Sequence, residues 1–288
     1  MTIDIHDALA SAIVADRRPP DGLLHPSGDL IGSLRHTMLT AAGAPTLERS
    51  VADSAPLIIG TLMHQFFERM LRGAPVMAEV NLTPWMLPMW TGTADAFVWD
   101  DEARGFVLHD WKTSSPESWT HLRKDGAKKE HIWQTSAYWW AAVTAGFPMV
   151  KTIAVLYFPK GRPRRGTAEP MLIEFAPLPW EVIEPVMTER SVLVKQYLDA
   201  VHLTGEWVNA ALAPVQDRVQ TLRKEKDGHR DVVLEPHFTT AYCSFPDELC
   251  DCRHQGETKI GYWYQDDDGT HIYVPRKGYE HIDPEVTP

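Results

Sequence analysis

The chain has 288 residues, of which 44% are hydrophobic and 23% are charged, and this balance excludes a wholly disordered protein. It contains no apolar run of about 18 residues and no basic stretch followed by an apolar block at its start, so we expect neither a membrane-spanning helix nor a cleaved secretory signal. The 28 Lys and Arg against 39 Asp and Glu give a net charge of −11, which argues against nucleic-acid binding by bulk positive charge but leaves room for a local basic groove or for contact through metal ions.

Two helices are predicted in the first quarter of the chain. The first spans residues 29–42, with Ser27 as its cap. The second spans residues 56–73, with a proline near its start and a glycine at its end, as helix termini favour. Because its apolar residues cover more than one face, we expect this helix to be buried. His64 lies on a face with helical spacing that points toward the interior. That face consists of Gly60, His64, Phe67 and Leu71.

The next part of the chain shows a strand pattern followed by a helix. A short, weak strand is predicted over residues 78–82. Residues 91–99 and 105–113 are predicted to be two strands of an antiparallel hairpin, joined by a polar turn. A helix over residues 129–146 and a buried strand over residues 151–158 follow. The order helix, strand, strand, helix, strand indicates a mixed α/β core.

The last part of the chain is expected to extend this core. A strand is predicted over residues 171–175 and a long helix over residues 180–203. Near the C-terminus, two aromatic strands around an Asp-Gly turn predict a hairpin. The three cysteines cluster ahead of it. Because an odd number of cysteines fits a reducing compartment better than a disulfide scaffold, we expect a cytoplasmic protein.

The segment GFVLHDWKT at residues 105–113 carries the strongest chemical signal. Side chains alternate between the faces of a strand, so Asp110 and Lys112 share a face. If the two predicted strands pair, Asp95 and Asp110 converge. Two carboxylates at the end of a hairpin bind a hard cation such as Mg²⁺, and a neighbouring lysine can orient a water or stabilise charge on a phosphate. The alternative interpretation is a surface ion pair on an edge strand.

Two other polar positions admit two interpretations each. His64 could be a metal ligand on a helix that packs over the sheet, or a histidine satisfied within the core. Gln134 and Tyr138 stand four residues apart and share a helix face. They could contact a substrate phosphate or nucleobase, or form an ordinary polar face with one aromatic residue.

Together these positions form four ordered motifs within residues 55–160: G-T-L-M-H (60–64), G-T-A-D (92–95), D-W-K (110–112) and Q-T-S-A-Y (134–138). The set resembles the PD-(D/E)XK nuclease superfamily, and within it the RecB-like exonucleases, the branch of recombination nucleases, CRISPR-adaptation nucleases and many phage exonucleases. Four motifs in order, with consistent spacing, are far more specific than any one of them. The resemblance implies a restriction-endonuclease-like fold, a mixed central sheet flanked by helices.

The resemblance also assigns roles to individual residues. It implies that His64, Asp95, Asp110 and the main-chain carbonyl of Trp111 bind the catalytic metal, Mg²⁺ or Mn²⁺. Lys112 would be the catalytic lysine, which positions a metal-activated water. Gln134 and Tyr138 would match the family's Q-x-x-x-Y helix motif, which arranges the site and contacts DNA.

The activity implied is metal-dependent hydrolysis of phosphodiester bonds by an exonuclease that acts on DNA ends, either single-stranded or resected from a duplex. The resemblance further suggests phage or bacterial recombination or repair, with a recombinase or annealing protein as partner. Two alternatives are an endonuclease or RNA-directed enzyme of the same fold, and a catalytically silent nucleic-acid-binding module. The implied division of the chain is an N-terminal entry segment at 1–54, a nuclease core at 55–178, and a region at 179–288 whose helix, cysteine cluster and hairpin pack on that core.

A basic loop follows the strand predicted over residues 151–158. Such a run is usually a solvated loop, but in an acidic nuclease local cations favour contact with backbone phosphates. Its cations are Lys160, Arg162, Arg164 and Arg165. Three lysines ahead of the Gln134 helix could contribute to the same contact. They are Lys124, Lys128 and Lys129.

The cysteine cluster could form a second metal site. Its candidate residues are Cys243, Cys250, Cys252 and His254, with His237 as another possible fourth ligand. The segment at residues 25–45 resembles the entry segment of the nuclease branch that carries an iron–sulfur cluster, yet residues 32–35 lack the cysteine expected there. Three interpretations therefore stay open: a Zn²⁺ site, a degenerate iron–sulfur cluster with a ligand other than cysteine, or a metal-free group packed as small hydrophobic residues.

Overall fold

The computed structural model describes residues 21–47, 51–71, 74–115, 118–160 and 169–206, and in the C-terminal part 219–224, 230–235, 245, 249, 258–265 and 270–277. The elements up to residue 159 are α2 (Pro26–Asp29), α3 (Leu34–Ala41), α4 (Val51–Met70), β1 (Val76–Asn81), the 3₁₀ helix η1 (Thr83–Trp85), β2 (Thr93–Asp100), β3 (Gly105–Ser114), α5 (Trp119–Asp125), α6 (Lys129–Thr144) and β4 (Met149–Pro159). They are followed by β5 (Met171–Phe175), α7 (Trp180–Thr204), β6 (Val219–Lys224), β7 (Arg230–Glu235), β8 (Thr258–Gln265) and β9 (His271–Pro275).

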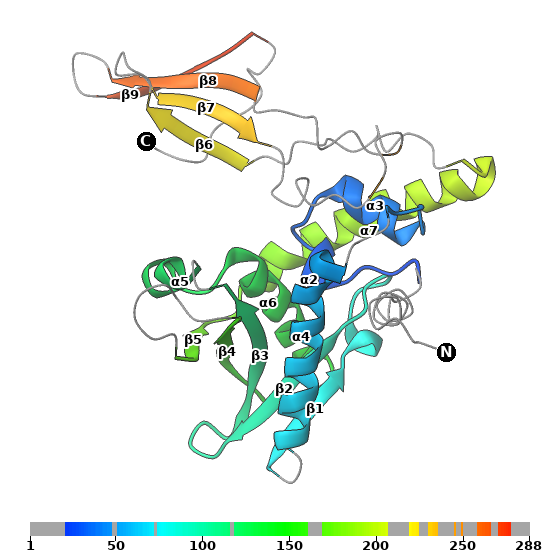
Figure 1. The fold of residues 1–288 in the computed structure, drawn as a ribbon, viewed down its shortest axis with the longest axis vertical. Coiled ribbons are helices and arrows are strands. Elements are labelled where there is room, and N and C mark those ends of the chain that lie inside the picture. The colour runs from blue at the N-terminus through cyan, green and yellow to red at the C-terminus, as the bar shows by residue number, and fades with distance from the viewer. Residues whose placement is uncertain are drawn as a thin grey trace, which may run out of the picture.

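The centre of the fold is a five-stranded sheet in the order β1-β2-β3-β4-β5 (Figure 1). The strands β1, β2 and β3 pair antiparallel, β3 and β4 pair parallel, and β5 is antiparallel to β4. A parallel pair needs a crossover connection, and α5 and α6 lie in the segment that supplies it. The sheet is therefore mixed and flanked by helices, which confirms the predicted mixed α/β class with a central sheet flanked by helices.

The two faces of the sheet are covered by different helices. On one face, Phe67 of α4 packs against Trp111 and Phe158, with ring centroids 5.2 and 4.4 Å apart, and Figure 1 shows α4 crossing the strands. On the other face, Trp139 of α6 shares a hydrophobic cluster with Leu108 and other buried sheet residues. Because β3 alternates between these faces, Trp111 meets α4 while Asp110 and Lys112 lie on the side of α6.

A second hydrophobic cluster joins α2, α3 and α7 at one end of the sheet. Trp90, in the segment before β2, anchors it because its indole N–H donates to the Ser191 hydroxyl of α7 at 2.8 Å. Phe245 is 1% exposed within this cluster, and its ring meets that of His36 on α3 at 5.2 Å. Phe245 therefore brings a point of the C-terminal region into contact with the core.

The helix predicted over residues 56–73 differs from the prediction in two ways. It begins at Val51, and one side of it is exposed although we expected burial. A single helix lying on a sheet can bury only the side that meets the strands, so the apolar residues on the other side stay accessible. Those residues are Ile59, Leu62, Phe66 and Met70, which are 41–66% exposed.

The helix predicted over residues 29–42 begins later than predicted: α2 ends at Asp29, and α3 covers only Leu34–Ala41. The predicted cap, Ser27, lies inside α2, while the hydroxyl of Ser33 accepts a hydrogen bond from the amide of His36 at the start of α3. Serine is favoured at the N-cap of a helix, and this segment contains two serines. The prediction chose Ser27 as the cap, whereas the helix is capped by Ser33.

The strands β6–β9 form a second, antiparallel sheet in sequence order. Its last pair, β8 with β9, confirms the predicted C-terminal hairpin. The strands β6 and β7 were not predicted because their charged residues obscure the alternation on which a strand prediction depends. Among the helices that the structure describes, none combines the length and apolar character needed to cross a bilayer.

Candidate active site

The predicted site residues gather at the point where β2 and β3 separate, which we call the strand split. The two strands pair from Asp100 opposite Gly105 as far as Ala96 opposite His109. Beyond that point β2 stays paired with β1, while β3 continues beside β4. The main-chain groups that face the split therefore have no partner strand there and need other partners.

Asp95 fills this gap with its side chain. One carboxylate oxygen, Oδ2, accepts the amide hydrogen of Trp111 at 2.6 Å, so Asp95 takes the place of the missing ladder partner. The other oxygen, Oδ1, lies 3.4 Å from Nδ1 of His64 on α4. Asp95 is 8% exposed and connects three elements of the fold: α4, β2 and β3. The predicted convergence of His64 and Asp95 is present.

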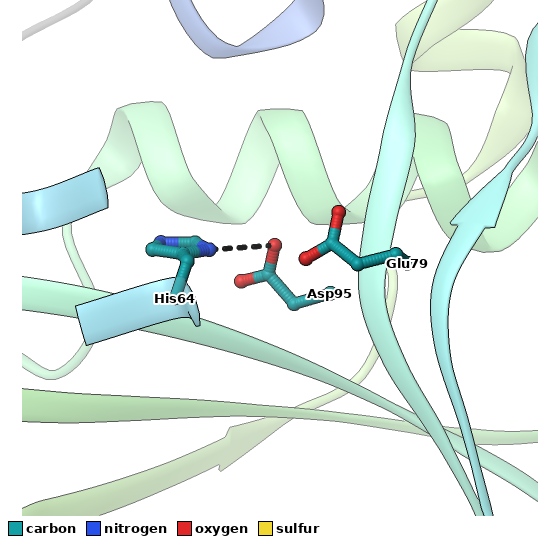
Figure 2. A group of neighbouring side chains, drawn as sticks. All are labelled: His64, Glu79 and Asp95. Carbon is teal, nitrogen blue, oxygen red and sulfur yellow. Dashed lines mark ion pairs between the residues drawn. The ribbon is translucent and has the colours of Figure 1, made fainter. Parts of the chain in front are cut away.

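Glu79 adds a third ligand that the sequence analysis missed. The residue lies in β1 with φ 52°, a left-handed conformation that costs a residue other than glycine about 1–3 kcal/mol. Its neighbours Ala78 and Val80 pair with Ala96 and Ala94 of β2, on either side of Asp95. Its side chain reaches the same place as His64 and Asp95, as Figure 2 shows, and one ligand atom from each of the three lies within 4.8 Å of the others.

These three side chains could hold a divalent metal ion. Two carboxylates and one imidazole are donors that such a cation accepts. The hydrogen bond to Asp95 raises the pKa of His64 above its ordinary value of 6.5, against the opposing effect of burial. The site is thus poised to hold positive charge, either a proton on His64 or a cation that replaces it. A signal for Glu79 did exist in the sequence, because it is the only acid in the run VMAEVNL of residues 76–82.

Asp110 and Lys112 form an ion pair beside this group. The ammonium of Lys112 lies 2.8 Å from Oδ2 and 2.9 Å from Oδ1 of Asp110, which is 1% exposed. Burial raises the pKa of Asp110 from 3.8 to about 6, and the charge of Asp95 adds to this effect while Lys112 opposes it. One ammonium therefore compensates incompletely for the carboxylates gathered here, as expected for a site that accepts a further cation.

The predicted helix pair on α6 is also in place. The side-chain amide of Gln134 donates to the Tyr138 hydroxyl at 3.5 Å, and both residues are buried. The ring of Tyr138 presses against Gly92 so closely that a Cβ at residue 92 would overlap its Cε1 atom. The glycine of the G-T-A-D motif is therefore required by the tyrosine of the Q-T-S-A-Y motif, which joins two motifs that are far apart in the sequence.

The remaining predicted residues divide into two groups. Lys160 directly follows β4, is exposed, and its amide donates to the carbonyl of Ser114 at 2.9 Å. The amide of Trp111 contacts Asp95, and the metal-binding role of its carbonyl stays a prediction. The other predicted residues lie outside the described part of the chain. They are Arg162, Arg164, Arg165, Cys243, Cys250, Cys252, His237 and His254.

Comparison with known proteins gives only distant similarities. No family model and no curated protein matches the chain. Among solved structures, the crystal structure of SSO0001 has 18% identity and a TM-score of 0.44, over 66% of this chain and 87% of that chain. The alkaline exonuclease LHK-Exo from Laribacter hongkongensis has 14% identity and a TM-score of 0.41, over 72% of this chain and 100% of that chain, and its complex with dAMP gives the same values. The fold and site described above rest on the geometry of this chain itself.

Proposed function

We propose that the protein is a metal-dependent deoxyribonuclease that hydrolyses phosphodiester bonds at DNA ends. One observation carries this proposal: at the strand split, the group of His64, Glu79 and Asp95 lies beside the buried ion pair of Asp110 and Lys112. A ligand set for a divalent cation next to a lysine is an arrangement that can activate a water and stabilise the charge that develops in phosphodiester hydrolysis.

The side chains divide the work between them. His64, Glu79 and Asp95 would hold the metal, with Asp110 at hand as a further carboxylate. When bound, a divalent cation lowers the pKa of a bound water and offsets negative charge on the phosphate. Lys112 would hold the attacking water in position, because Asp110 fixes the position of its ammonium. Mg²⁺ or Mn²⁺ suits this donor set, and the imidazole favours Mn²⁺ in a direct comparison.

The preference for DNA ends rests on the four ordered motifs and their resemblance to RecB-like exonucleases. On the same ground we propose a role in phage or bacterial recombination or repair, in which a recombinase or annealing protein would take over the processed strand. If the protein cut closed circular DNA, it would be an endonuclease of the same fold. The site assignment would then stay unchanged.

The decisive experiment is a nuclease assay on end-labelled linear single- and double-stranded DNA and on closed circular DNA, with Mg²⁺, Mn²⁺ or a chelator. We expect linear DNA to be degraded from its ends with either metal and not with the chelator. Lys112→Ala should abolish cleavage while DNA binding persists.

The matched control is Lys195→Ala, which removes the lysine of an exposed ion pair with Asp199 on α7 and should cleave like the unaltered protein. Full cleavage by Lys112→Ala, or by the unaltered protein in chelator, would refute the proposed site. DNA binding without cleavage under any metal would favour the silent binding module instead.

A further inference from the structure

A chain of hydrogen bonds beside the proposed site ends at His131, on the first turn of α6. The main-chain amide of Lys128 donates to the hydroxyl oxygen of Tyr157 at 3.2 Å, and the same oxygen lies 2.7 Å from Nδ1 of His131. An amide can only donate, so the tyrosine oxygen accepts from Lys128. Its own hydrogen is then available to Nδ1 of His131.

Burial keeps the side chains of His131 and Tyr157 neutral. It lowers the pKa of His131 from 6.5 to about 3, with the charges of Lys112 and Lys128 acting in the same direction. It also raises the pKa of Tyr157. A neutral imidazole that accepts at Nδ1 must carry its hydrogen on Nε2. Among the residues that the structure describes, Nε2 has no hydrogen-bond partner, and the side chain is only half-buried.

The position of His131 connects it to the catalytic groups. Tyr157 of β4 lies directly opposite Lys112 of β3 in the parallel register, so the two side chains share a face of the sheet. His131 precedes Gln134 by three residues on α6 and lies near the same helix face. A neutral N–H donor thus lies near the candidate site, where the charges of both Lys112 and Lys128 act on it.

We propose that His131 is a substrate-binding residue whose Nε2–H donates to a backbone phosphate of the DNA, with the charges of Lys112 and Lys128 nearby. This inference deepens the proposed function and rests on it. Two cations and a fixed neutral donor favour an anion with several acceptor oxygens, and a phosphate next to the scissile one is the anion that a DNA substrate brings to this site.

The test compares His131→Leu, His131→Gln, Tyr157→Phe and Lys128→Gln, with His202→Leu as the matched control at an exposed histidine in the last turn of α7. Binding of a fluorescein-labelled single-stranded oligonucleotide is measured over a range of salt concentrations, with Ca²⁺ in place of Mg²⁺, and kcat and KM are measured with Mg²⁺. Thermal melting of each variant establishes that it is folded.

We expect His131→Leu to weaken binding about tenfold, the scale of a hydrogen bond to a charged group, and to raise KM more than it lowers kcat. Glutamine places an amide N–H close to the position of Nε2, so His131→Gln should recover most of the affinity, and Tyr157→Phe should fall between the two. The salt dependence separates a neutral donor from a cation. Lys128→Gln should reduce the slope of log K against log salt by about 0.7, and His131→Leu should leave the slope unchanged.

A second measurement locates the contact. Single phosphates of the oligonucleotide are replaced in turn by uncharged methylphosphonates. One replacement should weaken binding to the unaltered protein several-fold and have little effect on His131→Leu. The inference would be overturned if every methylphosphonate replacement weakened binding equally in both proteins, or if His131→Leu bound DNA as tightly as His202→Leu. Cleavage would remain as the separate test of the proposed function. If the unaltered protein neither binds nor cleaves DNA, the proposed function fails and this inference fails with it.

Discussion

The candidate site has an acidic side and a basic side that are built from different parts of the fold. The acidic side consists of His64, Glu79 and Asp95. These residues come from α4, β1 and β2 and meet at the strand split. The basic side consists of Lys112 of β3 together with Lys128 and His131 at the start of α6. The Tyr157 hydroxyl of β4 holds His131 in place. The difference indicates that one site serves opposite charges: the acidic side suits a cation, and the basic side suits the phosphate on which that cation acts.

Asp95→Asn should have the largest effect, because it removes charge from the acidic side without removing the contact to β3. The asparagine carbonyl can still accept the amide of Trp111, so we expect the fold to persist, with a change in melting temperature of only a few degrees. Cleavage should fall by about a thousandfold, as when a group that stabilises transition-state charge is lost. Steady-state kinetics and calorimetric titration with Mn²⁺ measure the two effects.

The matched control for this variant is Asp199→Asn, at an exposed ion pair on α7, which should change neither quantity. An Asp95→Asn protein that binds Mn²⁺ as tightly as the unaltered protein would show that the metal lies elsewhere.

Glu79 allows a sharper test, because function and stability should change in opposite directions. Glu79→Gly removes a ligand from the acidic side and should lower Mn²⁺ affinity and activity by about 10–100-fold. Glycine also adopts φ 52° without strain, so the same change should stabilise the fold by about 1 kcal/mol or less, allowing for the greater freedom of glycine in the unfolded chain. Glu79→Gln should lower the Mn²⁺ affinity without this gain in stability. Equal unfolding free energies for the two variants would contradict the argument from strain.

These residues also show how far the sequence predicts the site. The hairpin of β2 and β3 and the helix α6 follow from local alternation and helical spacing, so Asp95, Asp110 and Gln134 were placed on the correct elements. Glu79 was not predicted although it is the only acid of its strand, because its meeting with His64 and Asp95 depends on the pairing of β1 with β2 and on a left-handed conformation at residue 79. The role of His131 depends on Tyr157, 26 residues away, and becomes visible only when α6 packs on the sheet.

The link between two motifs can be tested by Gly92→Ala. The added methyl group would overlap the ring of Tyr138, so the ring must move away from β2. Overpacking of this kind costs about 1–3 kcal/mol, and the displacement should also break the contact of Tyr138 with Gln134. We expect a lower unfolding free energy and about a tenfold loss in kcat, the scale of one misplaced contact.

The corresponding double variant, Gly92→Ala with Tyr138→Ala, has no ring left to collide with the methyl group. Its loss of stability should therefore be smaller than the sum of the two single losses, as a denaturant-melting cycle would show. Additive losses would mean that the glycine has another role.

The smallest expected effect concerns the basic side, where His131 links stability to pH. In the folded protein its pKa is about 3, against 6.5 for an ordinary histidine, so between these values the unfolded chain binds more protons at this position than the native protein does. The unfolding free energy must therefore rise with pH between about 3 and 6.5 and lose this dependence above that range. At pH 5.5 the effect is about 1 kcal/mol for a side chain that is partly accessible. His131→Gln lacks the titrating group, so its stability should not carry this pH dependence. As the pH falls from 7.5 to 5.5, the unaltered protein should therefore lose more unfolding free energy than the variant. A constant difference over that range would mean that His131 has the same pKa in the native protein as in the unfolded chain, and burial would then not hold it neutral on the basic side.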